Sequence, residues 1–509
     1  MNTSHVLLAT GLLSGICIPF AGTGNPKTEK KPNIIYILTD DLGYGDVSVN
    51  NPKSKISTPN IDRLAKQGIR FTDAHSPSAV CTPTRYGILT GRYSWRSDLK
   101  SGVLNGYSQS LIEKDRTTVA SFLKRNGYTT GVVGKWHLGL DWVQKPGSVN
   151  ADSQAGSPNI KVINPETLDF SQIPTDGPNN HGFDYSYILP ASLDMPPYCY
   201  LENNKLTAPL TAQTPGSNPA NGTTGAFWRA GLMSPDFVFE QVTPTFTQKA
   251  ISFIRNQATS DKPFFLYIPF PSPHTPWLPL PEYIGTSGAG EYGDFVQMVD
   301  TEVGKILKTL SELGLDENTV VFFTSDNGPF WKPPFIEKFE HRSAADFRGM
   351  KADAFEGGHR VPFIVRWPGK IKPDTQCSET TVLTNLLATC SGIVNQNLAT
   401  SEGEDSFSIL PLLLGKTNDY IRPEALIQHS SRGYFVVRQG DWKLITGLGS
   451  GGFSQPERIQ PKEGEAPGQL YNLKNDQAET TNVYDQNPEK VKELTAILKK
   501  FQESGRSRN

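Results

Sequence analysis

Four segments of this chain repeat one pattern, in which an amphipathic helix is followed by a short loop and an apolar strand. They are residues 58–76, 117–139, 244–276 and 300–328. A further strand, in "PNIIYILTDD" (residues 32–41), is a continuous apolar run, as expected of a strand buried on both faces. Helices and strands that alternate across short loops favour an α/β fold with a large, mostly parallel sheet flanked by helices.

Four of the predicted strands are followed by polar side chains. These are Asp40 and Asp41, Lys135 and His137, His274, and Asp326 and Asn327. In open α/β sheets the ligand site lies beyond the carboxyl ends of the strands, so we expect these distant groups to converge. Lys135 and His137 are two positions apart, and on an extended chain both would point to the same side.

The two acidic pairs favour a hard divalent cation. Carboxylate and amide oxygens suit Ca²⁺ or Mg²⁺, and the absence of clustered Cys or His disfavours zinc. For either pair alone, a helix cap or a turn is the simpler interpretation. Two such pairs after two strands favour the metal site.

Cys81 stands where a loop turns into a helix, in "CTPTRYGILTG". Pro83 suits the first turn of that helix and Gly91 closes it. A helix N-terminus attracts anions, and Arg85, one turn along, can point back toward Cys81. The simplest interpretation of a lone cysteine is a small buried apolar side chain, but this spacing favours a reactive site.

The start of the chain resembles a targeting segment. We interpret residues 1–24 as a secretory signal and residues 25–31 as a polar tether, which predicts a secreted or periplasmic protein. Cys17 raises the alternative of a lipoprotein anchor, but Ile16 stands where a small residue is expected. No other stretch is long and apolar enough to span a bilayer. The net charge of −2 gives no reason to expect a nucleic acid as partner.

The rest of the chain divides into three stretches by composition. Residues 32–414 form the expected catalytic domain, in which 141–241 is a Pro-, Asn-, Ser- and Gly-rich excursion over the mouth of the site. Residues 415–509 predict a smaller α+β unit with antiparallel strands and a terminal amphipathic helix. The remaining cysteines are too widely spaced for a disulfide framework, and Cys377 and Cys390 either pair or are buried separately.

The sequence resembles the type I sulfatases of the alkaline-phosphatase-like superfamily, and especially the arylsulfatase A-like and N-acetylgalactosamine-sulfatase-like members. Their signature, C-x-P-[S/T/A]-R followed by L-T-G, stands here as Cys81, Pro83, Thr84, Arg85 and residues 89–91. The likeness continues through "GKWHLG", "HGFDYSY", "PFFLYIPFPSPHTP", "VVFFTSDNG" and "RGMKADAFEGGHRVPFIVRWPG". It covers nearly the whole chain in order.

The resemblance implies that Cys81 is oxidised to Cα-formylglycine (3-oxoalanine) by a formylglycine-generating or anaerobic sulfatase-maturating enzyme. It implies one Ca²⁺ held by Asp40, Asp41, Asp326, Asn327 and the modified residue 81. The catalytic residues that it implies are Cys81, Arg85, Lys135, His137, His274 and Lys351. In this scheme the aldehyde hydrate attacks sulfur, His274 or Lys351 protonates the departing oxygen, and His137 deprotonates the second hydroxyl so that sulfate leaves.

The same resemblance suggests exo-action on a terminal galactose or N-acetylgalactosamine sulfate of host or dietary glycans, such as glycosaminoglycans or mucins. The candidates for contacting the sugar are His181, Asp194, Tyr198, Trp228 and Arg348. We expect His75 and His341, which belong to no motif, to be surface or cap groups, and His359, in "EGGHRVP", to be structural. Two other functions stay open, a phosphatase or phosphodiesterase with two zinc ions and a glycan-binding protein without activity.

Overall fold

The computed structural model describes residues 1–3, 30–148, 151–154, 156–219 and 225–508. The chain divides into two units, residues 1–30 and 31–509, and the described helices and strands belong to the second. Most of the expected signal segment, Cys17 and most of the tether lie outside the described residues. Among the residues that are described, no helix combines the length and apolar character that crossing a membrane would require.

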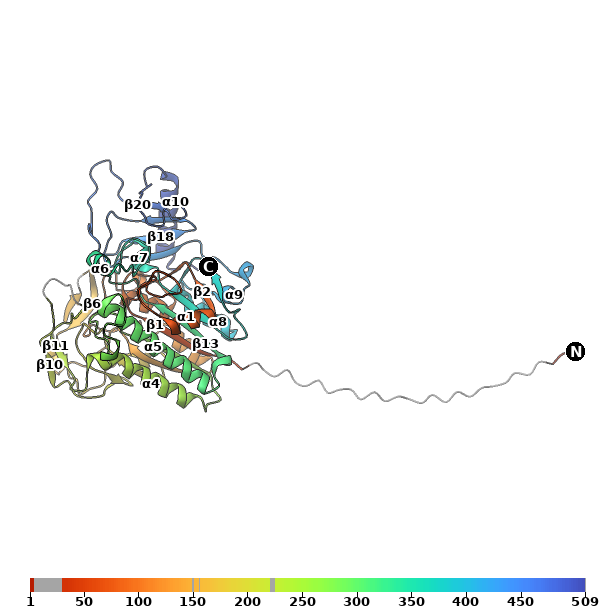
Figure 1. Ribbon diagram of the computed structural model, residues 1–509, viewed down its shortest axis with the longest axis horizontal. Helices are drawn as coiled ribbons and strands as arrows, with labels where there is room; N and C mark the ends of the chain where they lie inside the picture. The colour runs from red at the N-terminus through yellow and green to blue at the C-terminus, as the bar shows by residue number, and fades with distance from the viewer. Residues whose placement is uncertain (4–29, 149–150, 155, 220–224, 509) are drawn as a thin grey trace. The chain divides into compact units, whose positions relative to one another are not determined.

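A ten-stranded mixed sheet forms the centre of the second unit (Figure 1). In spatial order its strands are β15 (Thr375–Cys377), β2 (Ile69–Phe71), β14 (Phe363–Arg366), β13 (Thr319–Ser325), β1 (Asn33–Thr39), β12 (Phe264–Pro269), β4 (Thr129–Lys135), β7 (Tyr185–Leu189), β8 (Leu201–Glu202) and β9 (Lys205–Leu206). The five strands from β13 to β7 are parallel, and β14 is antiparallel to both of its neighbours. The predicted fold class is confirmed.

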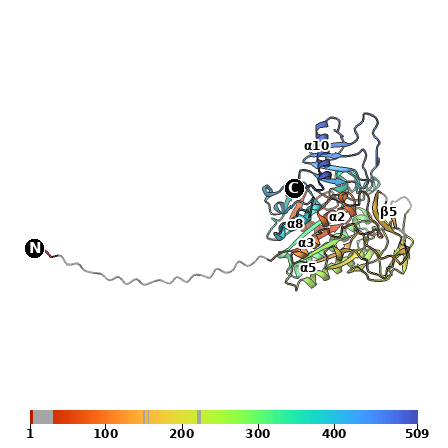
Figure 2. The ribbon, with the colours of Figure 1, turned by 180° about the vertical axis from the view of Figure 1, so that it is seen from behind.

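Helices cover both faces of this sheet. α1 (Pro59–Lys66), α4 (Val242–Gln257) and α5 (Gly290–Glu312) pack on one face, and α2 (Cys81–Thr90), α3 (Val119–Arg125) and α8 (Leu386–Val394) pack on the other (Figures 1 and 2). Every residue of β1 is buried, as its uninterrupted apolar run predicts. Alternate residues of β1 enter different clusters, because neighbouring side chains point to opposite faces of a strand.

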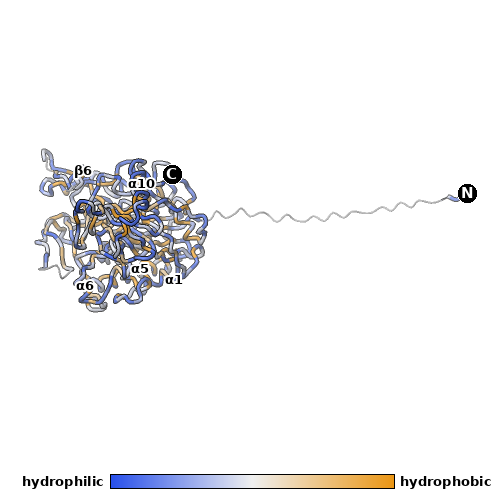
Figure 3. The backbone as a smooth tube through the Cα atoms, turned by 90° about the horizontal axis from the view of Figure 1, so that it is seen from above, coloured by the Kyte–Doolittle hydropathy of each residue, from blue (hydrophilic) through white to orange (hydrophobic). Residues whose placement is uncertain are grey.

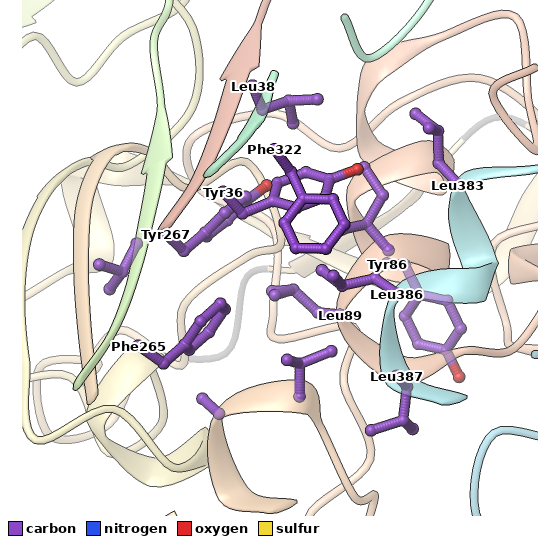
Figure 4. Close-up of a cluster of buried hydrophobic side chains, with 14 of the residues drawn as sticks. Tyr36, Leu38, Tyr86, Leu89, Phe265, Tyr267, Phe322, Leu383, Leu386 and Leu387 are labelled. Atoms are coloured by element: carbon purple, nitrogen blue, oxygen red, sulfur yellow. The ribbon is translucent and has the colours of Figure 1, made fainter. Parts of the chain in front are cut away.

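The cluster on the α2 side shows how the sheet fixes the helix that carries Cys81. Side chains of the strands meet side chains of α2 and α8 there (Figure 4), and those drawn include Tyr36, Leu38, Phe322, Tyr86, Leu89, Leu386 and Leu387. All ten residues of α2 are buried. Figure 3 shows the apolar stretches of the chain gathered in the interior of the folded unit. Burial of this kind stabilises by roughly 25 cal/mol per Å² of apolar surface.

Local signals explain where the predicted helices begin and end. Thr118 caps α3 by accepting a hydrogen bond from the backbone N–H of Ser121, and the Ser121 hydroxyl accepts one from the backbone of Thr118. α2 ends at Gly91, whose φ of 64° is left-handed and costs little for glycine.

The C-terminal segment forms a second, antiparallel sheet. Its strands are β17 (Leu426–His429), β18 (Phe435–Gln439), β19 (Trp442–Ile445) and β20 (Gln469–Asn472). The amphipathic helix α10 (Pro488–Ser504) packs on it through residues such as Leu494 and Phe501. This matches the expected α+β unit, and the boundary expected near residue 414 stays a prediction.

The excursion of residues 141–241 contributes to the main sheet. β7 extends the parallel strands beyond β4, and β8 and β9 complete that edge. Two small hairpins pair β5 (Ala151–Gln154) with β6 (Ser157–Ile163), and β10 (Ala212–Thr214) with β11 (Gly231–Met233). β8, β9, β10 and β11 have two or three residues each, too few to produce a clear periodicity in the sequence. The remaining short elements are β3 (Ala74–His75), α6 (Pro333–Phe339), α7 (Glu356–His359), β16 (Thr381–Val382) and α9 (Leu410–Leu413).

His75, His341 and His359 are all buried, and for His75 and His341 this corrects the expectation of a surface or cap position. His75 lies between Asp73, 2.6 Å from its Nε2, and His359, whose Nδ1 is 2.9 Å from the Nδ1 of His75. His341 Nε2 lies 2.7 Å from Asp46 Oδ1. Burial is tolerated because each imidazole has a carboxylate or ring-nitrogen partner. Cys377 and Cys390 are both free, so they do not pair.

Candidate active site

The polar residues at the strand ends converge, as predicted. β13, β1, β12 and β4 are neighbours and parallel, so their carboxyl ends meet at one edge of the sheet. Lys135 Nζ reaches Asp40 Oδ2 at 2.5 Å, and the backbone N–H of Asp41 donates to Asp326 Oδ1 at 3.3 Å. His274 follows β12 after a loop, and its Nε2 lies 3.7 Å from Asp41 Oδ2.

His137 reaches the site by a different route from the one expected. Its φ of 54° is left-handed, so the chain from Lys135 to His137 is not an extended strand. The backbone N–H groups of Trp136 and His137 donate to the carbonyls of Leu189 and Pro190, which hold this turn against the end of β7.

The acidic residues form a cluster that fits a divalent cation. Atoms of Asp40, Asp41, Cys81 and His274 that could bind a metal all lie within 4.8 Å of one another. Asn327 Nδ2 donates to Asp41 Oδ1 at 2.7 Å and joins the second acidic pair to the first. Asp40 Oδ1 and Asn327 Oδ1 are buried without a hydrogen-bond partner among the described residues. Buried oxygens of this kind are rare unless they accept from water or bind an ion.

The pKa values of the carboxylates also indicate a site for a divalent cation. Burial and the negative charge of Asp40 raise the pKa of Asp326 to about 7. Asp40 is equally buried, but Lys135, His274 and Arg85 lower its pKa well below the usual range. A cation between these carboxylates would relieve their mutual repulsion. The donor set of carboxylate and amide oxygens suits Ca²⁺, so the residues fit the expected ion.

Three cations surround the cluster. Arg85 donates from Nε and Nη2 to Asp326 Oδ2, at 3.0 and 2.8 Å, and from Nη1 to the carbonyl of Lys135. Lys135 Nζ also donates to Ser192 Oγ at 3.1 Å. Lys351 Nζ donates to Asp41 Oδ2 at 2.8 Å, and Asp41 raises the pKa of Lys351 although burial opposes this. Three cations balance three carboxylates, so a bound divalent ion would leave the site positive and suited to an anion.

Cys81 is the first residue of α2, and the segments around it are hydrogen-bonded to one another. Thr82 Oγ1 donates to the carbonyl of His137 at 3.0 Å, and the backbone N–H of Ala352 donates to the carbonyl of Ala79 at 2.7 Å. These bonds fix residue 81 beside the segments that carry His137 and Lys351. Burial raises the pKa of the Cys81 thiol to about 12, although Lys135 and Lys351 oppose the shift. A thiol with that pKa is not a nucleophile at neutral pH.

Hydrogen bonds fix which nitrogen of each site histidine is available. His137 Nε2 lies 2.7 Å from the carbonyl of Leu104, so Nε2 carries the proton, and the buried Nδ1 has no partner among the described residues. Burial, followed by Lys135 and Arg85, lowers the pKa of His137 well below its usual value, so its ring is neutral. His274 Nδ1 lies 2.6 Å from the carbonyl of Thr275, which leaves Nε2 to exchange a proton.

A cavity of about 510 Å³ opens above this cluster. Cys81, His137, His274, Lys351 and Asp41 line its inner part. Asp194, one of the predicted sugar contacts, also lines it. Arg229 Nη1 donates to Asp194 Oδ2 at 2.5 Å, and the buried Oδ1 of Asp194 has no hydrogen-bond partner among the described residues.

The structure places four of the five predicted sugar contacts outside the lining of this cavity. His181 is buried with its Nε2 2.9 Å from Asp176 Oδ1, where it holds the loop before β7. Arg348 lies over the ring of Phe355, 3.9 Å from its centroid, and its Nη1 donates to the carbonyl of Glu479. Tyr198 and Trp228 are also absent from the cavity lining. His181 and Tyr198 are buried, Trp228 is half-buried and Arg348 is exposed.

Several residues of the site were not predicted. Ser192 follows β7, so the rule that the ligand site lies beyond the carboxyl ends of strands would have found it had β7 been recognised. Arg229, Phe330, Lys332 and Phe453 line the cavity from loops without a motif, and no sequence pattern indicates them.

The geometry supports chemistry on an anionic ester. The site offers an oxygen-rich ion position, three cations, a residue at a helix N-terminus and two histidines with one free nitrogen each. Such a set can bind an anion, stabilise charge that moves during group transfer and exchange protons at two points.

Comparisons with known proteins agree with this chemistry. A family model described as "Sulfatase" matches residues 32–395. The chain is 35% identical to an N-acetylgalactosamine-6-O-sulfatase of Bacteroides thetaiotaomicron, over 97% of both chains. It is 32% identical to arylsulfatase A of Bos taurus, over 92% of this chain and 87% of that one. A solved structure from a study of glycosaminoglycan metabolism by B. thetaiotaomicron superimposes with a TM-score of 0.77 and 33% identity, covering 93% of this chain and 99% of that one.

Proposed function

Because this chain belongs to the sulfatase family and is a sulfuric ester hydrolase, we propose that it removes sulfate from a terminal galactose or N-acetylgalactosamine of a sulfated glycan. The N-acetylgalactosamine-6-O-sulfatase that matches it over 97% of both chains makes the 6-sulfate of N-acetylgalactosamine the first ester to test. We include in the proposal that residue 81 is converted to formylglycine and that the site holds Ca²⁺.

One observation carries this proposal. Cys81 lies at the start of α2 within the acidic cluster, lines the cavity, and has a thiol too basic to act as a nucleophile. A buried cysteine of this kind needs conversion to another group before it can react. When formed, the hydrated aldehyde would supply one hydroxyl as nucleophile and a second as the source of a proton.

Asp40, Asp41, Asp326 and Asn327 would hold Ca²⁺, which would supply positive charge beside the nucleophile and the sulfate oxygens. The unpartnered oxygens of Asp40 and Asn327 support this assignment. Arg85, Lys135 and Lys351 would bind and orient the sulfate group, because they are the cations within hydrogen-bond distance of the acidic cluster.

The two histidines would handle the protons. His274 Nε2 would give a proton to the sugar oxygen that departs, since Nδ1 is bonded to the carbonyl of Thr275. His137 is neutral with a free Nδ1, so Nδ1 would accept a proton when sulfate is released. The Leu104 carbonyl keeps the proton of His137 on Nε2 and therefore fixes this role.

Two further steps belong to the proposal. The chain would be exported by residues 1–24, and a formylglycine-generating or anaerobic sulfatase-maturating enzyme would convert Cys81.

The experiment is a measurement of sulfate release from a panel of monosulfated galactose and N-acetylgalactosamine. Wild-type protein, made together with a maturating enzyme, is compared with Cys81→Ala and with the control Cys377→Ala, which changes a free cysteine outside the cavity. We expect release by the wild type and the control, and a loss of several orders of magnitude in Cys81→Ala.

Two results would contradict the proposal. Sulfate release by Cys81→Ala at the wild-type rate would remove residue 81 from the chemistry. Turnover of phosphate esters in place of sulfate esters, with two zinc ions bound, would establish the phosphatase function in its place.

A further inference from the structure

The cavity changes in character from its inner end to its outer end. Cys81, His274 and Lys351 at the inner end are 2%, 7% and 8% exposed, whereas Phe453 on the lining is 46% exposed. A large aromatic ring that stays exposed on a cavity wall offers an apolar surface to a ligand that fills the cavity. The binding of one sulfate group at the inner end would therefore leave the outer part of the cavity unused.

Phe453 belongs to an aromatic and cationic group that we call the outer wall, made of Phe330, Lys332 and Phe453. The rings of Phe330 and Phe453 meet edge to face, with centroids 5.9 Å apart. Lys332 Nζ lies 4.9 Å from the centroid of Phe330. Among the residues that the structure describes, none forms a salt bridge with Lys332, so its charge stays available to a ligand.

The outer wall is fixed to the catalytic segment. Asp353 accepts hydrogen bonds from the backbone N–H groups of Phe453 and Ser454, at 2.7 and 3.0 Å, through the same oxygen. Asp353 is two residues from Lys351. Gly452 approaches so closely that an added Cβ would lie 2.3 Å from the carbonyl carbon of Ala352. Phe453 thus keeps a fixed position relative to Lys351, as a binding wall requires.

We propose that the outer wall is a subsite for the sugar next to the sulfated one, and that this neighbour carries a negative charge. The inference rests on the proposed function, because it assumes that the sulfated sugar occupies the inner cavity. The apolar face of a pyranose ring would pack on Phe453 and Phe330, and its carboxylate or sulfate would pair with Lys332. The substrate is then an anionic oligosaccharide, and a single sugar fills only part of the site.

Four substrates test this inference, all with the same terminal sulfated sugar. They are the monosaccharide, a disaccharide with a uronic acid as neighbour, a disaccharide with a sulfated neutral neighbour, and the carboxyl-reduced disaccharide with an uncharged neighbour. The ratio of kcat/KM between substrates is measured for each variant. The two charged disaccharides distinguish a carboxylate from a second sulfate as the recognised group.

Two variants of the outer wall are each compared with a matched control. Lys332→Gln is compared with Lys338→Gln, since Lys338 Nζ lies 4.8 Å from the ring of Phe339 in the same kind of contact but outside the cavity. Phe453→Ala is compared with Ile459→Ala, an exposed apolar residue of the same loop that does not line the cavity.

We expect the wild type to prefer a charged over the uncharged disaccharide, and Lys332→Gln to reduce this preference by about three- to tenfold. Phe453→Ala should reduce the ratio of kcat/KM between the uncharged disaccharide and the monosaccharide by a similar factor. Both controls should keep the wild-type ratios. Unchanged ratios in Lys332→Gln and Phe453→Ala, or a wild type that prefers the monosaccharide, would overturn the inference.

Binding separates this inference from the proposed function. Dissociation constants for the four sugars are measured by calorimetry with Cys81→Ala, which needs no turnover. If the dissociation constants show the expected ratios but the wild type releases no sulfate, the result contradicts the proposed function and supports the subsite. Equal affinities for all four sugars would overturn the subsite whether or not sulfate is released.

Discussion

Lys351 Nζ and Asp41 Oδ2 lie 2.8 Å apart, although 310 positions separate them in the sequence. Both partners of this contact are held in place. Asp41 follows the central strand β1, and the backbone N–H of Ala352, the residue after Lys351, donates to the carbonyl of Ala79, two positions before Cys81. The residues proposed to bind the metal, residue 81 and the cation proposed to bind sulfate are therefore held together by these hydrogen bonds. Substitutions of these residues should affect stability and activity together.

Calcium should stabilise the folded protein. The cluster of Asp40, Asp41 and Asp326 is repulsive without an ion, and an ion that binds only the folded state stabilises it by about 2.7 kcal/mol at 100 times its dissociation constant. We expect Ca²⁺ to raise the melting temperature of chelator-treated protein by a few degrees. Asp40→Asn should abolish the shift, and Asp441→Asn, at an exposed site, should keep it. An equal shift in both variants would place the ion elsewhere.

Replacing Arg85 should destabilise the protein in proportion to the hydrogen bonds lost. Arg85→Lys keeps the charge but loses the paired contact with Asp326, for an expected cost of about 1–3 kcal/mol in the free energy of unfolding. Arg85→Ala leaves Asp326 buried without its partner, for about 3–5 kcal/mol. Urea unfolding measures both. Arg432→Lys is the control, because its partner Glu457 is at the surface, and it should cost at most about 1 kcal/mol. Wild-type stability in Arg85→Ala would show that the contact contributes nothing.

Acid should destabilise the protein through His429. Burial lowers the pKa of His429 from 6.5 to about 4. Between these values the unfolded state binds the extra proton and the folded state does not, so stability falls as the pH drops from 6.5 to 4. Over the whole range from pH 6.5 to pH 4, His429 lowers the free energy of unfolding by about 3 kcal/mol. Unfolding measured at several pH values should show a shallower decline in His429→Gln than in the wild type. The same slope in both proteins would contradict this assignment.

Gly91 should resist substitution more than a glycine with open space around it. Gly91 and Gly127 both have positive φ, so alanine at either position costs about 1–2 kcal/mol. A Cβ on Gly91 would also lie 2.9 Å from Ser406 Cβ and 3.0 Å from Gly403 Cα, whereas one on Gly127 meets nothing within 4 Å. Thermal unfolding should therefore show a larger loss for Gly91→Ala than for Gly127→Ala. Equal losses would show that the α2 terminus adjusts to the added methyl group.

Much of the fold and of the central site could be predicted from the sequence, because both depend on local patterns. The apolar run of β1 and the acids that follow it indicate a buried strand with its end at a ligand site. The parallel order of β13, β1, β12 and β4 then brings Asp40, Lys135, His274 and Asp326 together. The signature around Cys81 gives the position of α2 and its cap at Gly91.

The outer parts of the site could not be predicted in the same way. β7 has five residues and lies in a stretch of weak periodicity, so its place in the sheet and the role of the following Ser192 were missed. Phe453 reaches the cavity from the C-terminal unit, through hydrogen bonds to Asp353 that no sequence pattern encodes. His181 was assigned to the sugar because of its motif, but its partner Asp176 holds it in the scaffold.

The most direct test of the proposed chemistry is mass spectrometry of the peptide that carries residue 81, made on samples whose sulfate release has been measured. Samples matured to different extents are prepared by varying the amount of maturating enzyme. We predict that the rate of sulfate release rises in proportion to the fraction of Cys81 converted to the aldehyde, and that protein with only the thiol releases none. Full sulfate release by protein whose Cys81 is an unmodified thiol would contradict the account.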